Sequence, residues 1–173
     1  MRRCIWLLDL DGVLNGFGRC GWSAHPCRRR IVAGGVEWRM RWAPQLIDQI
    51  RDLYDSAAVE IRWATSWIDH NISRIEFLMG LPSFPTAYPP GTAGPDGHPV
   101  AKLAAALGVI DAGHRLIWTD DDAIPAGGSA RDALEAAGAL LIAPDLHRAL
   151  RPEHLNQIRD YLHAPDDRLE SAF

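Results

Sequence analysis

An uninterrupted hydrophobic run near the N-terminus ends at two aspartates. Residues 4–8 read Cys-Ile-Trp-Leu-Leu, and Asp9-Leu10-Asp11-Gly12 follows them. Such a run is typical of a strand buried on both faces, as in a parallel sheet covered by helices. Alternation along an extended chain puts Asp9 and Asp11 on the same side. Because ligands bind at the carboxyl ends of strands in open α/β sheets, the two carboxylates predict a functional site there.

A functional site explains the aspartate pair better than a calcium-binding loop or a surface turn does. A calcium-binding loop that began at Asp9 would need Gly at its sixth position and Glu at its twelfth, but Leu14 and Cys20 stand there. A solvated surface turn would not usually follow five apolar residues. Gly12 in addition allows the backbone to turn sharply and to approach a ligand closely.

Strand and helix patterns alternate along the rest of the chain, which predicts a parallel sheet flanked by helices. Residues 16–35, with glycines and three consecutive arginines, look like an irregular loop. Asp69 is a candidate N-cap, and Gly80 and Gly108 are candidate helix ends. The expected core strands are 4–10, 59–64, 84–88, 115–118 and 139–143, with a half-exposed strand at 36–42. The expected helices are 44–54, 69–79, 99–107, 129–137 and 152–163.

Polar residues also follow the later strands. Thr65 comes directly after the second core strand, where its hydroxyl can donate to a phosphoryl oxygen, and Ser66 takes that place if the strand is one residue longer. Lys102, the only lysine of the chain, begins a predicted helix, and an ammonium acts as a point charge against phosphate. Asp120, Asp121 and Asp122 follow the fourth strand. Three adjacent carboxylates repel one another, which favours a bound cation, although Asp122 is expected only to cap a turn.

These segments resemble the motifs of the haloacid dehalogenase (HAD) superfamily, most of whose members are Mg²⁺-dependent phosphohydrolases. Residues 5–15 match its first motif throughout, and Thr65, Lys102 and Asp120/Asp121 match the other three in order. The details around residues 63–71 and 118–122 are similar to those of small, poorly characterised bacterial proteins of this superfamily. The resemblance implies an α/β, Rossmann-like three-layer sandwich. Its central, mainly parallel sheet would have five strands, with a small β-hairpin flap at about 17–42 and no large cap.

The resemblance also implies roles for individual residues. Asp9 would attack phosphorus and form an aspartyl-phosphate, and Asp11 would serve as general acid and then base. Thr65, Ser66, Lys102 and Gly12 would bind the substrate phosphate. Mg²⁺ would be held by the Asp9 carboxylate, by the main-chain carbonyl of Asp11 and by a third acid, either Asp120 or Asp121. His70 and Asn71 would either face the substrate or cap a helix.

The charge of the chain is unevenly distributed. Residues 1–42 carry eight arginines against three acidic residues, a net charge of +5, whereas the remainder has a net charge of −9. A basic segment beside an acidic centre attracts anionic substrates, although Arg28-Arg29-Arg30 could equally be a solvated loop. With this charge, the resemblance implies a phosphorylated small molecule or nucleotide as the substrate. A nucleic-acid end phosphate and a non-catalytic phosphate- or partner-binding domain are the alternatives.

Length and composition indicate a single domain. The 173 residues suit one hydrophobic core, which we place at residues 1–165, with a polar tail at 166–173. No apolar stretch approaches the roughly 18 residues that span a bilayer, and the N-terminal apolar run is too short for a signal peptide. Three cysteines do not suggest a disulfide framework, so we expect a cytoplasmic protein with no membrane partner. The oligomeric state cannot be inferred from these patterns.

Overall fold

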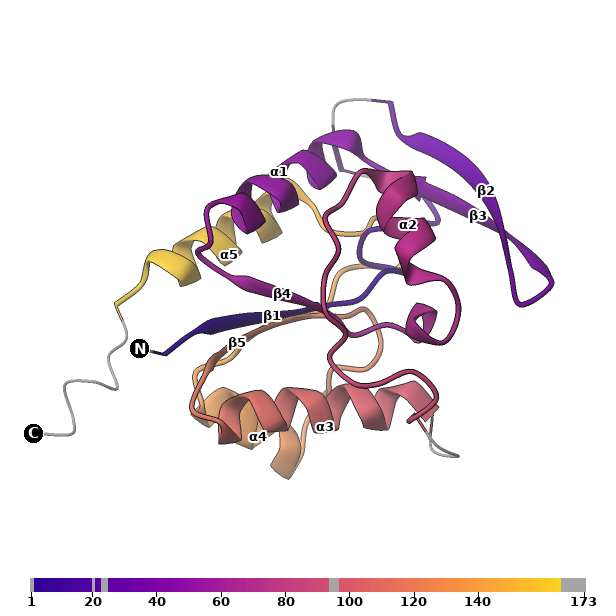
Figure 1. The fold of residues 1–173 in the computed structure, drawn as a ribbon. Coiled ribbons are helices and arrows are strands. Elements are labelled where there is room, and N and C mark those ends of the chain that lie inside the picture. The colour runs from indigo at the N-terminus through magenta and orange to yellow at the C-terminus, as the bar shows by residue number, and fades with distance from the viewer. Residues whose placement is uncertain (1, 20, 23–24, 94–96, 166–173) are drawn as a thin grey trace, which may run out of the picture.

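A parallel sheet covered by helices on both faces forms the centre of the molecule. The computed structural model describes residues 2–19, 21–22, 25–93 and 97–165, so the predicted tail at 166–173 lies outside the described residues. The sheet has the strand order β4-β1-β5-β6. Its strands are β1 (Cys4–Leu8), β4 (Glu60–Trp63), β5 (Arg115–Thr119) and β6 (Leu140–Ile142). Helices α1 (Pro44–Asp55) and α5 (Pro152–His163) lie over one face, and α3 (Gly97–Asp111) and α4 (Ser129–Ala136) over the other (Figure 1).

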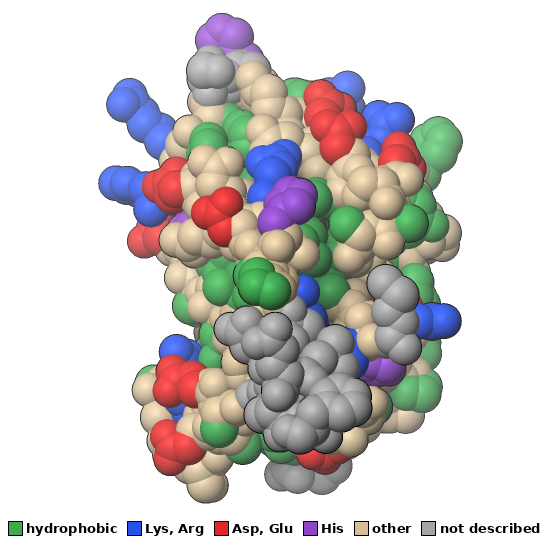
Figure 2. All heavy atoms as spheres, turned by 90° about the vertical axis from the view of Figure 1, so that its left-hand side faces the viewer, with side chains coloured by type: hydrophobic (Ala, Val, Ile, Leu, Met, Phe, Trp, Pro, Cys, Tyr) green, Lys and Arg blue, Asp and Glu red, His purple; other side chains and the backbone are tan. Residues whose placement is uncertain are grey.

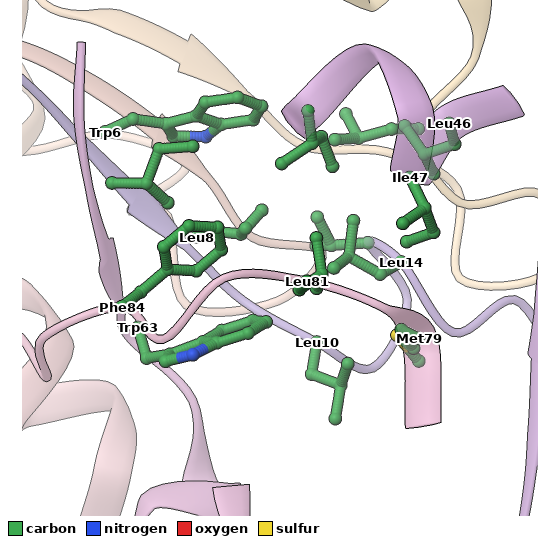
Figure 3. Close-up of a cluster of buried hydrophobic side chains, with 14 of the residues drawn as sticks. Trp6, Leu8, Leu10, Leu14, Leu46, Ile47, Trp63, Met79, Leu81 and Phe84 are labelled. Carbon is green, nitrogen blue, oxygen red and sulfur yellow. The ribbon is translucent and has the colours of Figure 1, made fainter. Parts of the chain in front are cut away.

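The central strand β1 is buried on both faces. Trp6 and Leu8 pack into the cluster beneath α1, where Figure 3 shows them near Leu46 and Trp63. Ile5 and Leu7 point to the opposite cluster, which α3 and α4 cover. Burial of one such side chain contributes about 1.5–3 kcal/mol to folding, so β1 is a well-anchored platform for the residues that follow it.

Successive strands of the chain are added on opposite sides of β1. The chain continues from β1 to β4 on one side of it, and then crosses to β5 on the other side. The carboxyl end of β1 is therefore the topological switch point, where open α/β sheets bind ligands.

A β-hairpin projects from the sheet after β1. Its strands β2 (Cys27–Ala33) and β3 (Val36–Trp42) pair antiparallel. Gly34 and Gly35 join them with φ angles of 57° and 77°, as a two-residue hairpin turn requires. The predicted hairpin is present, but the arginine triplet lies within strand β2 and not in an irregular loop, because it pairs in register with β3.

The prediction of a five-stranded sheet was wrong. The segment 84–88 runs beside β4 but makes only an isolated bridge between Trp63 and Thr86. Trp63 donates its N–H to the carbonyl of Pro85 and accepts a hydrogen bond from the N–H of Ala87. Pro85 has no N–H to offer, and Pro82 and Pro89 flank the segment, so a longer ladder cannot form.

Several predicted helix boundaries also differ, most of all those of the second and third helices. The predicted helix 69–79 is shorter: helix α2 covers Ile72–Met79, its N-cap is Asn71 and not Asp69, and a 3-10 turn, η1 (Ser66–Asp69), precedes it. The α2 helix ends at Gly80 as predicted, with φ of 72°. Helix α3 continues past Gly108 to Asp111. A glycine inside a helix costs only about 1 kcal/mol, which packing of α3 on β5 outweighs.

No helix among the described residues is long and apolar enough to cross a membrane.

Candidate functional site

The Asp9 carboxylate sits at the carboxyl end of β1, with only 4% of the residue exposed. Its backbone N–H still bonds to the carbonyl of Thr119, so the position belongs to the sheet edge. The N–H of Leu10 donates to Oδ1 at 2.7 Å, and the Lys102 ammonium contacts Oδ2 at 2.6 Å. Both oxygens of this buried carboxylate are therefore held in place by donors from two different elements.

Lys102 reaches the site from the first half of α3. Its Nζ atom lies 2.6 Å from Asp9 Oδ2 and 2.8 Å from Asp120 Oδ2. Burial alone would lower the pKa of Lys102, but the carboxylates of Asp9 and Asp120 outweigh it and raise that pKa above its usual value. The ammonium thus stays charged and partly neutralises the two acids.

A group of four carboxylates forms where β1 and β5 end. Asp9, Asp120, Asp121 and Asp122 each place an oxygen within 4.8 Å of the others. Asp120 is fully buried; its Oδ1 accepts hydrogen bonds from the N–H groups of Asp122 and Ala123. The turn is thus capped by Asp120, and the expectation that Asp122 caps it was wrong.

The second oxygen of Asp120 is less well satisfied. Oδ2 has the ionic contact with Lys102 but no hydrogen bond within the described part of the chain. One ammonium cannot balance four clustered carboxylates, so the group retains unbalanced negative charge. An all-oxygen donor set of this kind fits a hard divalent cation.

The pKa values reflect this crowding. Burial, reinforced by Asp120 and opposed by Lys102, raises the pKa of Asp9 to about 7. Burial and the neighbouring Asp122 and Asp120 raise the pKa of Asp121 to about 6. Burial and the contact with Asp120 also raise the pKa of Asp122. A nearby positive charge would therefore stabilise the ionised form of each of these carboxyls.

Asp11 faces different neighbours. Its Oδ1 accepts a hydrogen bond of 2.6 Å from the Asn15 amide, and its Oδ2 one of 2.8 Å from the indole N–H of Trp67. The Asp11 side chain is not among the clustered carboxylates. The two aspartates of the first motif thus have different surroundings: Asp9 belongs to the charged centre, and Asp11 lies beside it among neutral donors.

Gly12 is needed where the chain turns away from Asp11. Its φ is 69°, and a β-carbon there would lie 2.3 Å from Cγ of Asp121. Only glycine lets Asp121 approach the loop after β1 so closely.

Thr65 follows β4 and is buried; its hydroxyl accepts the N–H of Trp67 at 3.4 Å and lies close enough to Asp9 to lower the pKa of that carboxyl. Ser66 is exposed at the start of η1. The structure therefore brings Thr65, and not Ser66, to Asp9.

A chain of polar contacts continues from Thr65. The Tyr88 hydroxyl donates to the Thr65 carbonyl at 3.3 Å and lies 3.2 Å from His98 Nδ1. His98 Nε2 in turn lies 3.2 Å from Asp69 Oδ2. These contacts tie together the segment after β4, the loop before α3 and the start of α3, which carry Thr65 and Lys102.

His70 and Asn71 have structural contacts. The Asn71 side chain accepts the N–H of Arg74 and caps α2, as one of the two alternatives predicted. The His70 ring packs edge-on against Trp67, and a β-carbon at Gly34 in the hairpin turn would lie 3.5 Å from it.

Sequence reasoning did not assign Asn15 or Trp67 to the site, although both hold Asp11. Neither residue type signals an acid partner by itself, and the contact of Trp67 with Asp11 joins residues 56 positions apart. Asn15 lies only four residues from Asp11, so its contact could have been inferred from the sequence more readily than that of Trp67.

No family model, no curated protein and no solved structure matches this chain.

Proposed function

We propose that this protein is a Mg²⁺-dependent phosphohydrolase that acts through an aspartyl-phosphate, as its resemblance to the HAD superfamily implies. The observation that carries the proposal is the environment of Asp9. A buried carboxylate at the switch point of the sheet is held by a buried ammonium and faces three further carboxylates. A site of this composition can accept both a phosphoryl group and a cation.

The residues present fit a magnesium ion. Asp9 and Asp120 would hold it, with Asp121 and the main-chain carbonyl of Asp11 as further oxygen donors. The Oδ2 atom of Asp120, which has the ionic contact with Lys102 but no hydrogen bond in the described part of the chain, and the unbalanced charge of the group support this assignment. When bound, such an ion neutralises charge on the phosphoryl oxygens.

The remaining groups would then divide the reaction between them. Asp9 attacks phosphorus as the bond to the leaving oxygen breaks, and Asp11 gives that oxygen a proton. Water next attacks the phosphorus of the aspartyl-phosphate and gives its proton to Asp11, so that phosphate leaves and Asp9 is regenerated. Lys102 and Thr65 stabilise the phosphoryl oxygens and orient Asp9.

The proposal is tested by phosphate release from an aryl phosphate with and without Mg²⁺. We expect Mg²⁺-dependent release that falls to background in Asp9→Asn, because an amide is not a competent nucleophile. Asp55→Asn, an exposed position at the end of α1, is the matched control and should retain full activity. Equal rates for Asp9→Asn and the unmodified protein would exclude Asp9 as the nucleophile.

A second variant separates the roles of the two aspartates. Asp11→Asn should lower the rate about 10²–10⁴-fold, the usual contribution of general acid–base catalysis. Its Mg²⁺ affinity should change little, because the Asp11 side chain lies outside the carboxylate group. Loss of Mg²⁺ binding, measured by calorimetry, would instead make that side chain a metal ligand.

The non-catalytic alternative makes a different prediction. A phosphate-binding domain would bind a phosphate mimic such as tetrafluoroberyllate with Mg²⁺ and would release no phosphate from any monoester. The presence of two aspartates in separate environments favours the enzyme, because binding alone does not need a second carboxylate held by neutral donors.

A further inference from the structure

The outward face of the β2–β3 hairpin carries two pairs of arginines directly opposite each other. Arg28 pairs with Arg41 and Arg30 with Arg39 in the antiparallel register. Directly opposed residues lie on the same face, and like charges in such positions destabilise a sheet. The arrangement therefore works against the stability of the hairpin.

Acidic neighbours do not balance this face. Arg30 has Glu37 at 3.3 Å, but Arg28, Arg39 and Arg41 have no acidic partner among the described residues. The opposite side of the molecule differs, because Figure 2 shows acidic and basic side chains interspersed there. That opposite side thus does not share the concentration of cations found on the hairpin.

A pocket of about 680 Å³ lies along the hairpin beside the loop after β1. The four arginines of this face line it together with Arg29, Met40 and Phe17, 54% of which is exposed. The Nε atom of Arg41 is buried without a hydrogen-bond acceptor within the described part of the chain. Several guanidinium groups around one pocket, with one acidic partner among the four of this face, are the setting in which an anion supplies acceptors.

We propose that this arginine pocket binds the phosphate groups of a single-stranded nucleic acid. Successive arginine pairs are two residues apart along each strand, roughly 7 Å, which suits consecutive phosphates of an extended strand. An aromatic side chain beside a basic groove supplies a stacking surface for a base. Stacking on Phe17 would contribute nothing to the binding of a simple polyphosphate, so this side chain favours a nucleic-acid strand.

The pocket is connected to the candidate site. The Asn15 Oδ1 atom accepts the N–H of Arg41 at 2.7 Å, and the Asn15 amide donates to Asp11. A strand held by the arginines would therefore end beside the loop that carries the two aspartates. This inference names the substrate class of the proposed phosphohydrolase, and it rests on that proposal for the position of the reacting phosphate, but not for binding itself.

The experiment measures binding of a fluorescein-labelled single-stranded oligodeoxynucleotide of about ten residues by fluorescence anisotropy, over a series of salt concentrations. The full chain is used with EDTA, so that no turnover is needed. Arg28→Gln/Arg39→Gln should weaken binding at least tenfold and reduce the slope of log K against log salt by about 1.4. Arg51→Gln/Arg131→Gln removes the same charge from helical ion pairs and should have little effect.

Phe17→Ala separates a strand from a simple polyanion. It should weaken binding of the oligonucleotide severalfold and leave binding of inorganic tripolyphosphate unchanged. Equal effects on the two probes, or none on the oligonucleotide, would overturn the assignment to a nucleic acid. Absence of binding at low salt, or equal losses in the two double-arginine variants, would overturn the site itself.

Hydrolysis of the aryl phosphate, measured in parallel, separates this inference from the proposed function. In this assay the control variant Arg51→Gln/Arg131→Gln should keep the rate of the unmodified protein, and the arginine-pocket variant is judged by its oligonucleotide binding alone. Binding without any hydrolysis would refute the phosphohydrolase and leave the pocket standing. Hydrolysis without oligonucleotide binding would refute the pocket and leave the phosphohydrolase standing.

Discussion

Lys102 is the residue on which the charge balance of the site depends. Its ammonium is the counterion of both Asp9 and Asp120, and all three groups are buried. Removing one partner of a buried ion pair leaves an uncompensated charge in a poorly hydrated environment. The contribution of this lysine should therefore be visible in stability as well as in activity.

We expect Lys102→Met to lower the free energy of unfolding by about 3–5 kcal/mol in the absence of Mg²⁺, measured by urea denaturation. Added Mg²⁺ should restore part of the loss, since it would supply positive charge to the same carboxylates. Lys102→Met combined with Asp120→Asn should be more stable than Lys102→Met alone. If the double variant is less stable, the lysine acts through packing and not through charge.

At the scale of single residues, what the sequence predicts depends on how far apart along the chain the interacting groups lie. Asp9 and Thr65 were predictable because the end of a buried strand can be located from the sequence, and parallel strands bring their ends together. The hydrogen bonds of Asp11 to Trp67 and of Tyr88 to the Thr65 carbonyl depend on how separate segments pack. No local pattern encodes such contacts, so these partners could be found only from the structure.

At the scale of elements, predictions were reliable where hydrophobic periodicity was strong. Strand β3 and helix α5 have the predicted boundaries. The segment 84–88 has a strand-like composition, but its prolines remove the donors that a ladder needs. Helix α3 passes through Gly108, because burial of Val109 against β5 outweighs the propensity of one glycine.

The hairpin is attached to the candidate site by Asn15, which is almost fully buried. Asn15→Ala would leave the N–H of Arg41 and one oxygen of Asp11 without partners. We expect a loss of about 1–3 kcal/mol in stability and a lower turnover, because Asp11 is no longer oriented. Asn15→Asp is the matched control: it keeps an acceptor for Arg41 but places a second carboxylate beside Asp11. Wild-type turnover in Asn15→Ala would show that Trp67 alone orients Asp11.

At the scale of the whole molecule, stability and pH are linked through the carboxylates. Burial raises the pKa of Asp9 to about 7 and that of Asp121 to about 6, whereas both would be about 4 in the unfolded chain. Between about pH 4 and about pH 7, the folded state therefore binds more protons than the unfolded state. Their contribution favours folding at low pH and is lost as the pH rises towards 7.

The proposed magnesium ion should reverse this dependence, because it would bind the ionised carboxylates. We expect the increase in melting temperature on adding Mg²⁺ to be larger at pH 8 than at pH 5, measured by differential scanning calorimetry. Asp9→Asn/Asp121→Asn should remove most of the difference between the two pH values. An equal increase at both pH values would place the ion away from these groups.

The two ends of the segment that carries the hairpin meet at one point. The N–H of Gly16 bonds to the carbonyl of Arg41 at 2.9 Å, beside the contact of Asn15 with the same residue. Tolerance to exchange depends on burial, and the inward side of this segment is part of the core, because Ile31 and Met40 are buried there and Trp38 packs against Trp67. The outward positions of the hairpin, its arginines among them, are therefore the part that can be exchanged to redirect the same sheet and carboxylates to another class of substrate.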